Sequence, residues 1–330
     1  MPPSTPSPAP NDDARLAEGL AWAAKAIGDT GPGAEPIAGD ASFRRYFRLR
    51  HAAGTHVLMD APPGREDTAP FIDVAGRLRA AGLHAPEIVA ADPHRGFLLL
   101  EDLGDALYRD RITPQTADAE FEAVFDILAT MARAVDPAGL PAYDDHALQG
   151  ELDLYTDWYL ARHLGVRLEA EEREAWQGLC RFLLDAARAQ PQVFVHKDFH
   201  SCNLLHTGGA PGVIDFQDAL RGPVAYDTAS LLWDRYVAWP RERLTGWMRD
   251  LHGRLGLDAG PEEWERWCDL AGLQRNLKIV GIFARLRYRD GKQGYVEMIP
   301  RFYRYLLDVA PRYAEFAALQ RLLEDPRCAP

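Results

Sequence analysis

The first hundred residues alternate between helical and strand-like patterns of apolar side chains. Between Asp12 and Gly28, apolar residues recur at helical spacing and the stretch ends at a glycine, which favours a helix. Later apolar runs are short and are bounded by turns that contain glycine or proline, as in antiparallel strands. We therefore expect five antiparallel strands with two helices. The expected elements are a helix over 12–28, two short strands within 37–50, a strand over 55–59, a helix over 70–81, and strands over 88–91 and 96–100.

The pattern changes at residues 101–105, and beyond them apolar residues recur mainly at helical spacing. The expected helices span about 116–135, 145–164, 170–189, 224–239, 241–256 and 261–289, with further helix up to 324. One interruption, made by the apolar runs 193–195 and 212–216, predicts a β-hairpin-like insertion. The sequence thus predicts an α+β protein of two lobes. The expected parts are a disordered tail over 1–12, a small antiparallel-sheet lobe over 13–103 and a mainly helical lobe over 104–330.

The composition supports a large folded core and excludes several classes of function. The chain has 330 residues, 47% of them hydrophobic, and its net charge of -12 gives no support for nucleic-acid binding. The four cysteines form no CxxC pair, so reduced thiols are expected and a zinc site is not. The first ten residues lack the apolar core of a signal peptide, and no apolar run is as long as a membrane span. We expect a cytoplasmic protein with no membrane and no obligate protein partner.

A compact group of polar residues follows the predicted strand at 193–195. Asp198 and Asn203 are five residues apart in the motif H-K-D-F-H-S-C-N, and Asp215 follows the next apolar run. This pattern is typical of kinases, in which the first Asp faces the acceptor hydroxyl as catalytic base. The Asn and the second Asp bind Mg²⁺ on the phosphates of ATP, and oxygen ligands suit that cation. Any one of these residues alone is compatible with a turn or a helix cap, but their combination predicts a kinase.

The motifs resemble those of the aminoglycoside phosphotransferase/choline kinase superfamily. The resemblance rests on H-K-D-F-H-S-C-N-L-L over 196–205, G-V-I-D-F-Q-D-A over 212–219 and G-P-V-A-Y-D-T-A-S over 222–230. It implies a protein-kinase-like two-lobe fold that uses ATP and Mg²⁺. It also implies that Asp227 braces the catalytic loop through the loop's backbone, although a helix cap is an alternative role. We expect His196 to support the loop structurally.

Further sequence segments are similar to those of bacterial kinases that phosphorylate the anomeric hydroxyl of N-acetylmuramate and N-acetylglucosamine in peptidoglycan recycling. These segments are G-D-A-S-F-R-R-Y-F-R over 39–48, L-M-D-A-P-P over 58–63, F-L-L-L-E-D-L-G over 97–104 and Q-R-N-L-K-I-V-G-I-F-A-R-L over 274–286. The resemblance implies a small-molecule kinase whose acceptor is an amino sugar. Two alternatives stay open: a kinase of another hydroxyl acceptor, such as an aminoglycoside, choline or homoserine, and a non-catalytic nucleotide-binding pseudokinase.

The expected nucleotide site departs from the usual kinase pattern. The strand over 55–59 carries no lysine to pair with the α- and β-phosphates. A guanidinium can replace that lysine, because it forms two parallel hydrogen bonds with phosphate oxygens. Arg44 and Arg48 lie on one face of the preceding strand, so we expect one of them to contact the phosphates. Backbone groups at Glu101 and Leu103 are expected to hold the adenine.

The expected acceptor site lies in the helical lobe around Asp198. Aromatic faces and carboxylates bind sugars, and several segments of this lobe are rich in both. Core packing and surface ion pairs are alternative roles for each of these residues. The acidic content also suits a cationic acceptor. The candidate substrate residues are Glu151, Tyr155, Trp158, Asp234, Arg275 and Asn276.

Overall fold

The computed structural model describes residues 10–29, 31, 33–37 and 43–330. The chain divides into two compact units: the first comprises the residues up to Ala106 together with Leu205–Gln217, and the second comprises Leu107–Leu204 and Asp218–Pro330. The first unit contains an antiparallel sheet and the second is mainly helical, so the predicted α+β architecture is confirmed. The roles assigned to the lobes 13–103 and 104–330 remain a prediction. Of the predicted tail, Pro10 to Asp12 belong to the first helix, and the rest lies outside the described residues.

The first unit is built on a five-stranded sheet, as the alternating pattern predicts. Its strand order is β1-β2-β3-β5-β4, and every neighbouring pair is antiparallel. The turn before β5 needs a glycine, because Gly96 has φ 73° and a Cβ there would lie 1.9 Å from the Ala61 carbonyl oxygen. The elements are α1 (Pro10–Ile27), β1 (Gly33–Ile37), β2 (Arg45–His51), β3 (Gly54–Asp60), α2 (Ala69–Ala80), β4 (Ile88–Asp92) and β5 (Phe97–Glu101).

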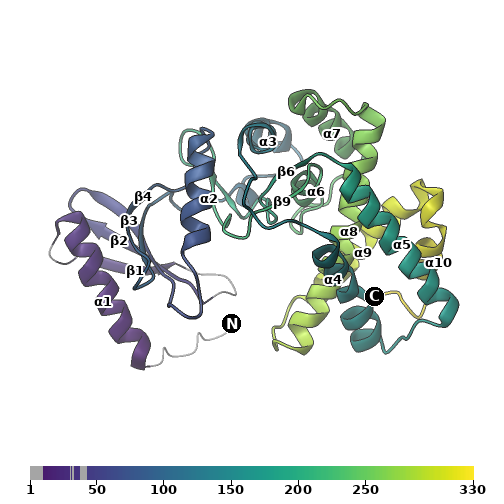
Figure 1. The fold of residues 1–330 in the computed structure, drawn as a ribbon, viewed down its shortest axis with the longest axis horizontal. Coiled ribbons are helices and arrows are strands. Elements are labelled where there is room, and N and C mark those ends of the chain that lie inside the picture. The colour runs from purple at the N-terminus through teal and green to yellow at the C-terminus, as the bar shows by residue number, and fades with distance from the viewer. Residues whose placement is uncertain (1–9, 30, 32, 38–42) are drawn as a thin grey trace. The chain divides into compact units, whose positions relative to one another are not determined.

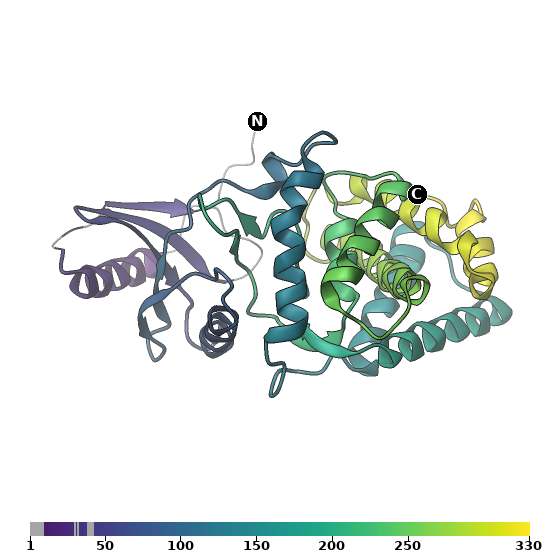
Figure 2. The ribbon, with the colours of Figure 1, turned by 90° about the horizontal axis from the view of Figure 1, so that it is seen from above.

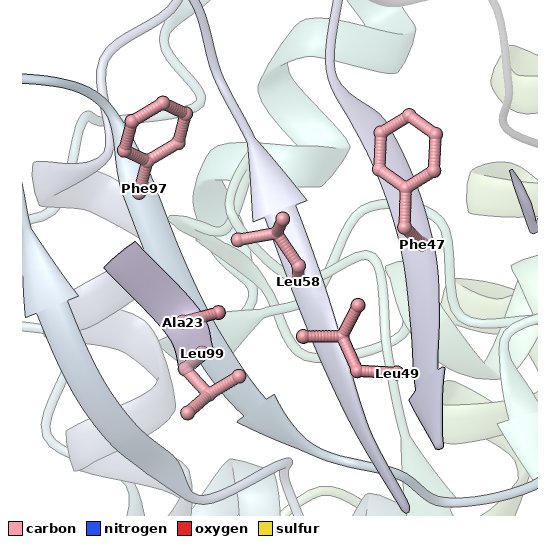
Figure 3. Packing of buried hydrophobic residues seen from close by; sticks show 6 residues of the cluster. All are labelled: Ala23, Phe47, Leu49, Leu58, Phe97 and Leu99. Carbon is pink, nitrogen blue, oxygen red and sulfur yellow. The ribbon is translucent and has the colours of Figure 1, made fainter. Parts of the chain in front are cut away.

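Helix α1 covers one face of this sheet (Figure 1). Residues two apart in a strand point to the same face, so Phe47 and Leu49 of β2 lie beside Leu58 of β3. Phe97 and Leu99 of β5 complete the row, and together these side chains bury Ala23 of α1 (Figure 3). The apolar period of α1 and the strand alternation therefore meet in one core, which fixes the register of β2, β3 and β5.

The second unit is a set of helices packed around a long central helix, α8 (Figures 1 and 2). Helix α8 contacts α4, α5, α6, α7 and α9. The helical elements are α3 (Ala117–Ala134), α4 (Asp145–Leu154), a π-helical continuation of α4 called η2 (Tyr155–Leu164), α5 (Ala170–Ala189), α6 (Tyr226–Leu232), α7 (Arg241–Leu255), α8 (Pro261–Tyr288), α9 (Ile299–Val309) and α10 (Ala317–Glu324). Short 3₁₀ turns occur at Tyr108–Asp110, Val296–Met298, Ala310–Arg312 and Ala314–Phe316. None of the helices within the described residues is long and apolar enough to cross a bilayer.

The strands around the predicted catalytic loop do not form the expected hairpin. β6 (Gln192–Val195) pairs with β9 (Leu220–Pro223), whereas β7 (Leu204–Leu205) pairs with β8 (Gly212–Val213). The predicted pairing of 193–195 with 212–216 is therefore wrong. Short apolar runs indicate strands but do not encode their partners, since pairing depends on contacts between distant segments.

Candidate active site

The predicted catalytic loop joins β6 to β7 in the second unit. Its backbone turns tightly, because the Asn203 N–H donates to the His200 carbonyl at 2.8 Å. The Asn203 side-chain amide nitrogen donates to the Asp198 carbonyl, also at 2.8 Å. The loop therefore closes on itself, and Asp198 and Asn203 are held together as the motif predicts.

Asp227 braces the start of this loop. Its carboxylate accepts the backbone N–H of His196 at 2.6 Å and that of Lys197 at 3.0 Å. Lys197 has φ 79°, a left-handed conformation that is unfavourable for a residue with a Cβ. Among the described residues, the non-glycine residues with positive φ are Lys197 and Asp215, which lie in the two functional motifs. The two hydrogen bonds of Asp227 hold this backbone strain in place.

A second carboxylate holds the far side of the loop. Asp234 accepts the backbone N–H of Ser201 at 3.4 Å and also the Ser201 hydroxyl. Asp234 is itself buried, and its carbonyl accepts the Tyr305 hydroxyl at 3.1 Å. The structure thus places Asp234, a predicted substrate residue, in contact with the loop backbone.

The Asp198 carboxylate is the functional centre of the loop. Among the residues that the structure describes, none donates a hydrogen bond to it. Burial alone would raise the pKa of Asp198, but the positive charges of Lys278 and Arg275 outweigh burial and lower it. Asp198 is consequently ionised at neutral pH and open to an incoming hydroxyl, as a catalytic base requires.

Lys278 belongs to a buried polar network that the sequence analysis missed. Its ammonium lies 2.8 Å from Glu151 and donates to the Tyr226 hydroxyl at 3.0 Å. Glu151 also accepts from Gln274 at 3.0 Å and from the Tyr143 hydroxyl. A lone lysine in the middle of an otherwise apolar helix was the available signal, because a buried ammonium needs a partner. The network pairs the predicted substrate residue Glu151 with Lys278, whose charge acts on the base.

The predicted metal ligands offer one amide and one carboxylate oxygen. The Asn203 side-chain nitrogen donates to the Asp198 carbonyl, so the amide oxygen is the atom through which Asn203 would bind a cation. One Asp215 oxygen accepts from Gln217 at 2.9 Å, and the residue has φ 64°. No group of three or more His, Cys, Asp or Glu suited to a metal occurs in the described part of the chain. The donors nonetheless fit Mg²⁺, which commonly takes one or two protein oxygens and completes its shell with phosphate and water.

The first unit gives Arg44 and Arg48 different surroundings. Arg44 donates to Glu66 at 3.0 Å and lies close to the half-buried Tyr46, on which the charge of Asp215 also acts. Arg48 instead reaches the end of β5, where it donates to Asp102 at 2.7 Å and to Asp105 at 2.6 Å. Arg44 is therefore the arginine that shares its surroundings with the predicted metal ligand Asp215 of the same unit.

Glu101 and Leu103 lie at the end of β5, where adenine binding is expected. The Glu101 carboxylate is occupied by His84 at 2.9 Å and by the Glu87 N–H at 3.1 Å. Neither the N–H nor the carbonyl of Leu103 has a hydrogen-bond partner among the described residues. The Leu103 backbone can thus still pair with the edge of a base. Residues 38–42, which precede Arg44 in the chain, lie outside the described residues.

The other predicted acceptor residues fall into two groups. Tyr155 is fully buried and stacks on Trp176 with 5.3 Å between ring centroids, whereas Trp158 is half-buried on η2. Arg275 and Asn276 are buried on α8, and the Arg275 charge acts on Asp198. The structure therefore brings Asp234 into contact with the catalytic loop and the Arg275 charge close to Asp198, whereas Glu151 is paired with Lys278 and Tyr155 lies in an aromatic core.

The loop, its braces and the ionised base match the organisation of a known group of enzymes. The model of the phosphotransferase enzyme family matches residues 33–269. The chain belongs to the phosphotransferase enzyme family. This phosphotransferase is 48% identical over 294 residues to an N-acetylmuramate/N-acetylglucosamine kinase of Pseudomonas aeruginosa, with 87% of each chain covered. It is 39% identical to a kinase of the same name from Neisseria meningitidis over 296 residues, 87% of this chain and 88% of the relative. The predicted family is confirmed, and the chain is a small-molecule kinase.

Solved structures support the fold of this phosphotransferase. A choline/ethanolamine kinase family protein from Mesorhizobium loti has a TM-score of 0.65 at 20% identity, covering 94% of this chain and 99% of that chain. An ADP-bound aminoglycoside phosphotransferase, APH(2'')-Ib, has a TM-score of 0.58 at 16% identity, covering 88% and 96%. The predicted kinase-like fold is confirmed, and ATP is the phosphoryl donor that the family implies.

Proposed function

We propose that the chain transfers the γ-phosphoryl group of ATP to the anomeric hydroxyl of N-acetylmuramate or N-acetylglucosamine. The product is the sugar 1-phosphate, an intermediate suited to cell-wall recycling in the cytoplasm. Relatives that are 33–48% identical over most of their length are named kinases of these two sugars. The observation that carries the reaction type is the ionised Asp198 carboxylate, which lacks a hydrogen-bond donor among the described residues and stands on a braced loop.

Asp198 acts as the base for the acceptor hydroxyl. An anomeric hydroxyl is a stronger acid than an ordinary alcohol, because the ring oxygen withdraws charge. A carboxylate with a lowered pKa is thus basic enough to orient this hydroxyl and to accept its proton as the phosphoryl group transfers. The braces from Asp227 and Asp234 fix the loop, so that the base keeps its position during the reaction.

The remaining site residues divide between the nucleotide and the metal. Asn203 and Asp215 hold Mg²⁺, which neutralises phosphate charge when it is bound. Arg44 is the better candidate for the missing phosphate lysine, because it is ion-paired with Glu66, as the phosphate lysine of a protein kinase pairs with a glutamate. Arg48 is held by two carboxylates and supports the adenine side of the site. The Leu103 backbone holds the adenine.

The experiment that tests this function is ³¹P NMR of the products formed from ATP and Mg²⁺ with a panel of acceptors. The panel contains N-acetylmuramate, N-acetylglucosamine, the methyl glycoside of N-acetylglucosamine, choline and an aminoglycoside. We expect a sugar 1-phosphate from the two free sugars and no product from the methyl glycoside, whose C1 oxygen is blocked.

Three outcomes would contradict the proposal in different ways. Phosphorylation of the methyl glycoside at the rate of the free sugar would place transfer at another hydroxyl. Reaction with choline or the aminoglycoside alone would favour a different acceptor. ATP binding without transfer to any acceptor would favour the pseudokinase alternative.

A further inference from the structure

Helix α8 carries a buried cation that has no direct counter-charge. Arg275 keeps only 7% of its surface exposed. Its guanidinium forms no hydrogen bond and no ion pair with any residue that the structure describes. The same charge lowers the pKa of Asp198, so the guanidinium lies near the catalytic carboxylate without touching it. A buried guanidinium normally binds carboxylates through its five donors, and leaving it unpaired is costly.

Lys278, one turn further along α8, shows how the chain neutralises a buried cation when its role is structural. Its ammonium has an ion pair with Glu151 and a hydrogen bond to Tyr226. Arg241 at the start of α7 is half-buried, and it too is paired, with Asp269 and Glu265. Arg275 therefore differs from its neighbours in keeping its donors available.

Two further groups beside Arg275 are buried without partners. The Asn276 amide has both its nitrogen and its oxygen buried, with no hydrogen bond among the described residues. The Nδ1 atom of His200 is also buried without a partner, and the charges of both Arg275 and Asp198 act on that ring. Buried polar atoms are seldom left unsatisfied in a folded protein. His200 belongs to the catalytic loop and feels the charge of Asp198, so its unsatisfied nitrogen indicates that a polar ligand completes the region beside the base.

We propose that Arg275 binds an anionic substituent of the acceptor sugar, the lactyl carboxylate of N-acetylmuramate, while Asp198 holds the anomeric hydroxyl. This proposal rests on the proposed function. N-acetylmuramate differs from N-acetylglucosamine by the lactyl ether that carries this carboxylate, so Arg275 is the residue that favours the acidic sugar. A guanidinium suits this task because its planar donors match a carboxylate.

The transferring phosphoryl group is the other anion near the base. Arg275 comes from α8 of the helical unit, which also carries the catalytic loop and the Glu151 network. The phosphate-binding candidate Arg44 comes from the sheet unit. This division favours the acceptor as the partner of Arg275. Comparing substrates with and without the carboxylate distinguishes the sugar carboxylate from the phosphoryl group as the anion that Arg275 binds.

The test measures kcat/KM for N-acetylmuramate, its methyl ester and N-acetylglucosamine, at saturating ATP. The variants are Arg275→Gln and Arg275→Lys, with Arg266→Gln as the matched control on α8, where Arg266 forms a surface ion pair with Glu315 at 2.8 Å. We expect Arg275→Gln to lower kcat/KM for N-acetylmuramate by about 10- to 100-fold, the effect of a lost charge-assisted hydrogen bond. Its effect on N-acetylglucosamine should stay below about 3-fold. Arg275→Lys should be intermediate.

The wild-type protein gives an arm of the test that needs no variant. Its kcat/KM for the neutral methyl ester should fall to near the value for N-acetylglucosamine. Equal turnover of ester and acid would overturn the proposal, even if Arg275→Gln failed to fold. An equal loss for both sugars in Arg275→Gln would assign Arg275 to the phosphoryl group instead. If the wild-type protein phosphorylated neither sugar, the proposed function itself would fail.

Discussion

The buried pair of Lys278 and Glu151 gives a sharp prediction for the helical unit. The ammonium and the carboxylate are 2.8 Å apart, and both side chains are largely buried. At an effective dielectric constant of about 20, their attraction is roughly 6 kcal/mol, and desolvation offsets part of it. Glu151→Gln leaves the Lys278 charge buried without its ion-pair partner, and the neutral Tyr226 hydroxyl remains as a hydrogen-bond acceptor. We expect this change to lower the free energy of unfolding by about 3–5 kcal/mol, as is usual when one partner of a buried pair is removed.

The pH dependence of this penalty follows from the direction of the pKa shift. Burial alone would lower the pKa of Lys278, but Tyr226, Glu151 and Asp198 outweigh it and raise the pKa above its unfolded value. The stabilisation by the ammonium is therefore complete below the ordinary lysine pKa of about 10.4 and is lost as pH rises through the folded value. Glu151→Gln removes one of the raising causes. Its penalty should accordingly shrink as pH approaches about 10, because Lys278 can then lose its proton.

Urea unfolding followed by tryptophan fluorescence measures the free energy of unfolding of the second unit, which contains Glu151 and Lys278. Of the eight tryptophans, seven lie in the second unit and only Trp22 lies in the first. Asp145→Asn is the matched control, because it breaks an exposed pair with Arg188 and should cost less than about 1 kcal/mol.

The double variant Glu151→Gln/Lys278→Met completes the thermodynamic cycle. It should recover most of the loss, because neither charge of the pair remains in the core. Additive effects of the two single changes, or a Glu151→Gln penalty below about 1 kcal/mol, would refute the inferred coupling.

Three further predictions concern the catalytic machinery. Asp198→Asn should lower kcat by about 10²- to 10⁴-fold and leave the Kd for ATP nearly unchanged by calorimetry, because the base acts on the acceptor; near-normal turnover would refute this role. Arg44→Met should raise the KM for ATP about tenfold or more. The control Arg50→Met, which breaks an exposed pair with Glu35, should leave this KM unchanged. A KM for ATP in Arg44→Met equal to that of the control would exclude Arg44 from the phosphate site. Asp227→Ala should destabilise the protein by about 2–5 kcal/mol in urea unfolding, because two N–H groups lose their acceptor; an unchanged midpoint would contradict the bracing role.

The sequence predicts most helices and strands because their apolar periods are local signals. The helix predicted over 170–189 matches α5, whose start carries a capping box between Glu169 and Glu172. The helix predicted over 224–239 is wrong in length, since α6 ends at Leu232. Beyond it, Asp234 turns towards Ser201 of the catalytic loop, a tertiary contact that no helical period records.

The catalytic motif is predictable for the same reason, since Asp198 and Asn203 lie on one short loop. The acceptor side is not, because its groups come from distant helices. Glu151 on α4 and Lys278 on α8 meet only in the folded chain, and neither spacing nor composition links them. The choice between Arg44 and Arg48 likewise depends on their partners Glu66 and Asp102, which lie in other segments.

The central claim is that the anomeric oxygen of the sugar attacks the phosphorus of ATP. N-acetylglucosamine labelled with ¹⁸O at C1, incubated with the wild-type protein, ATP and Mg²⁺, tests this directly by ³¹P NMR. The account predicts that the phosphate ester resonance carries the isotope shift of a bridging ¹⁸O atom, because the C1 oxygen is retained in the new P–O bond. An ester resonance without that shift would contradict the account, since the phosphoryl group would then be on another oxygen.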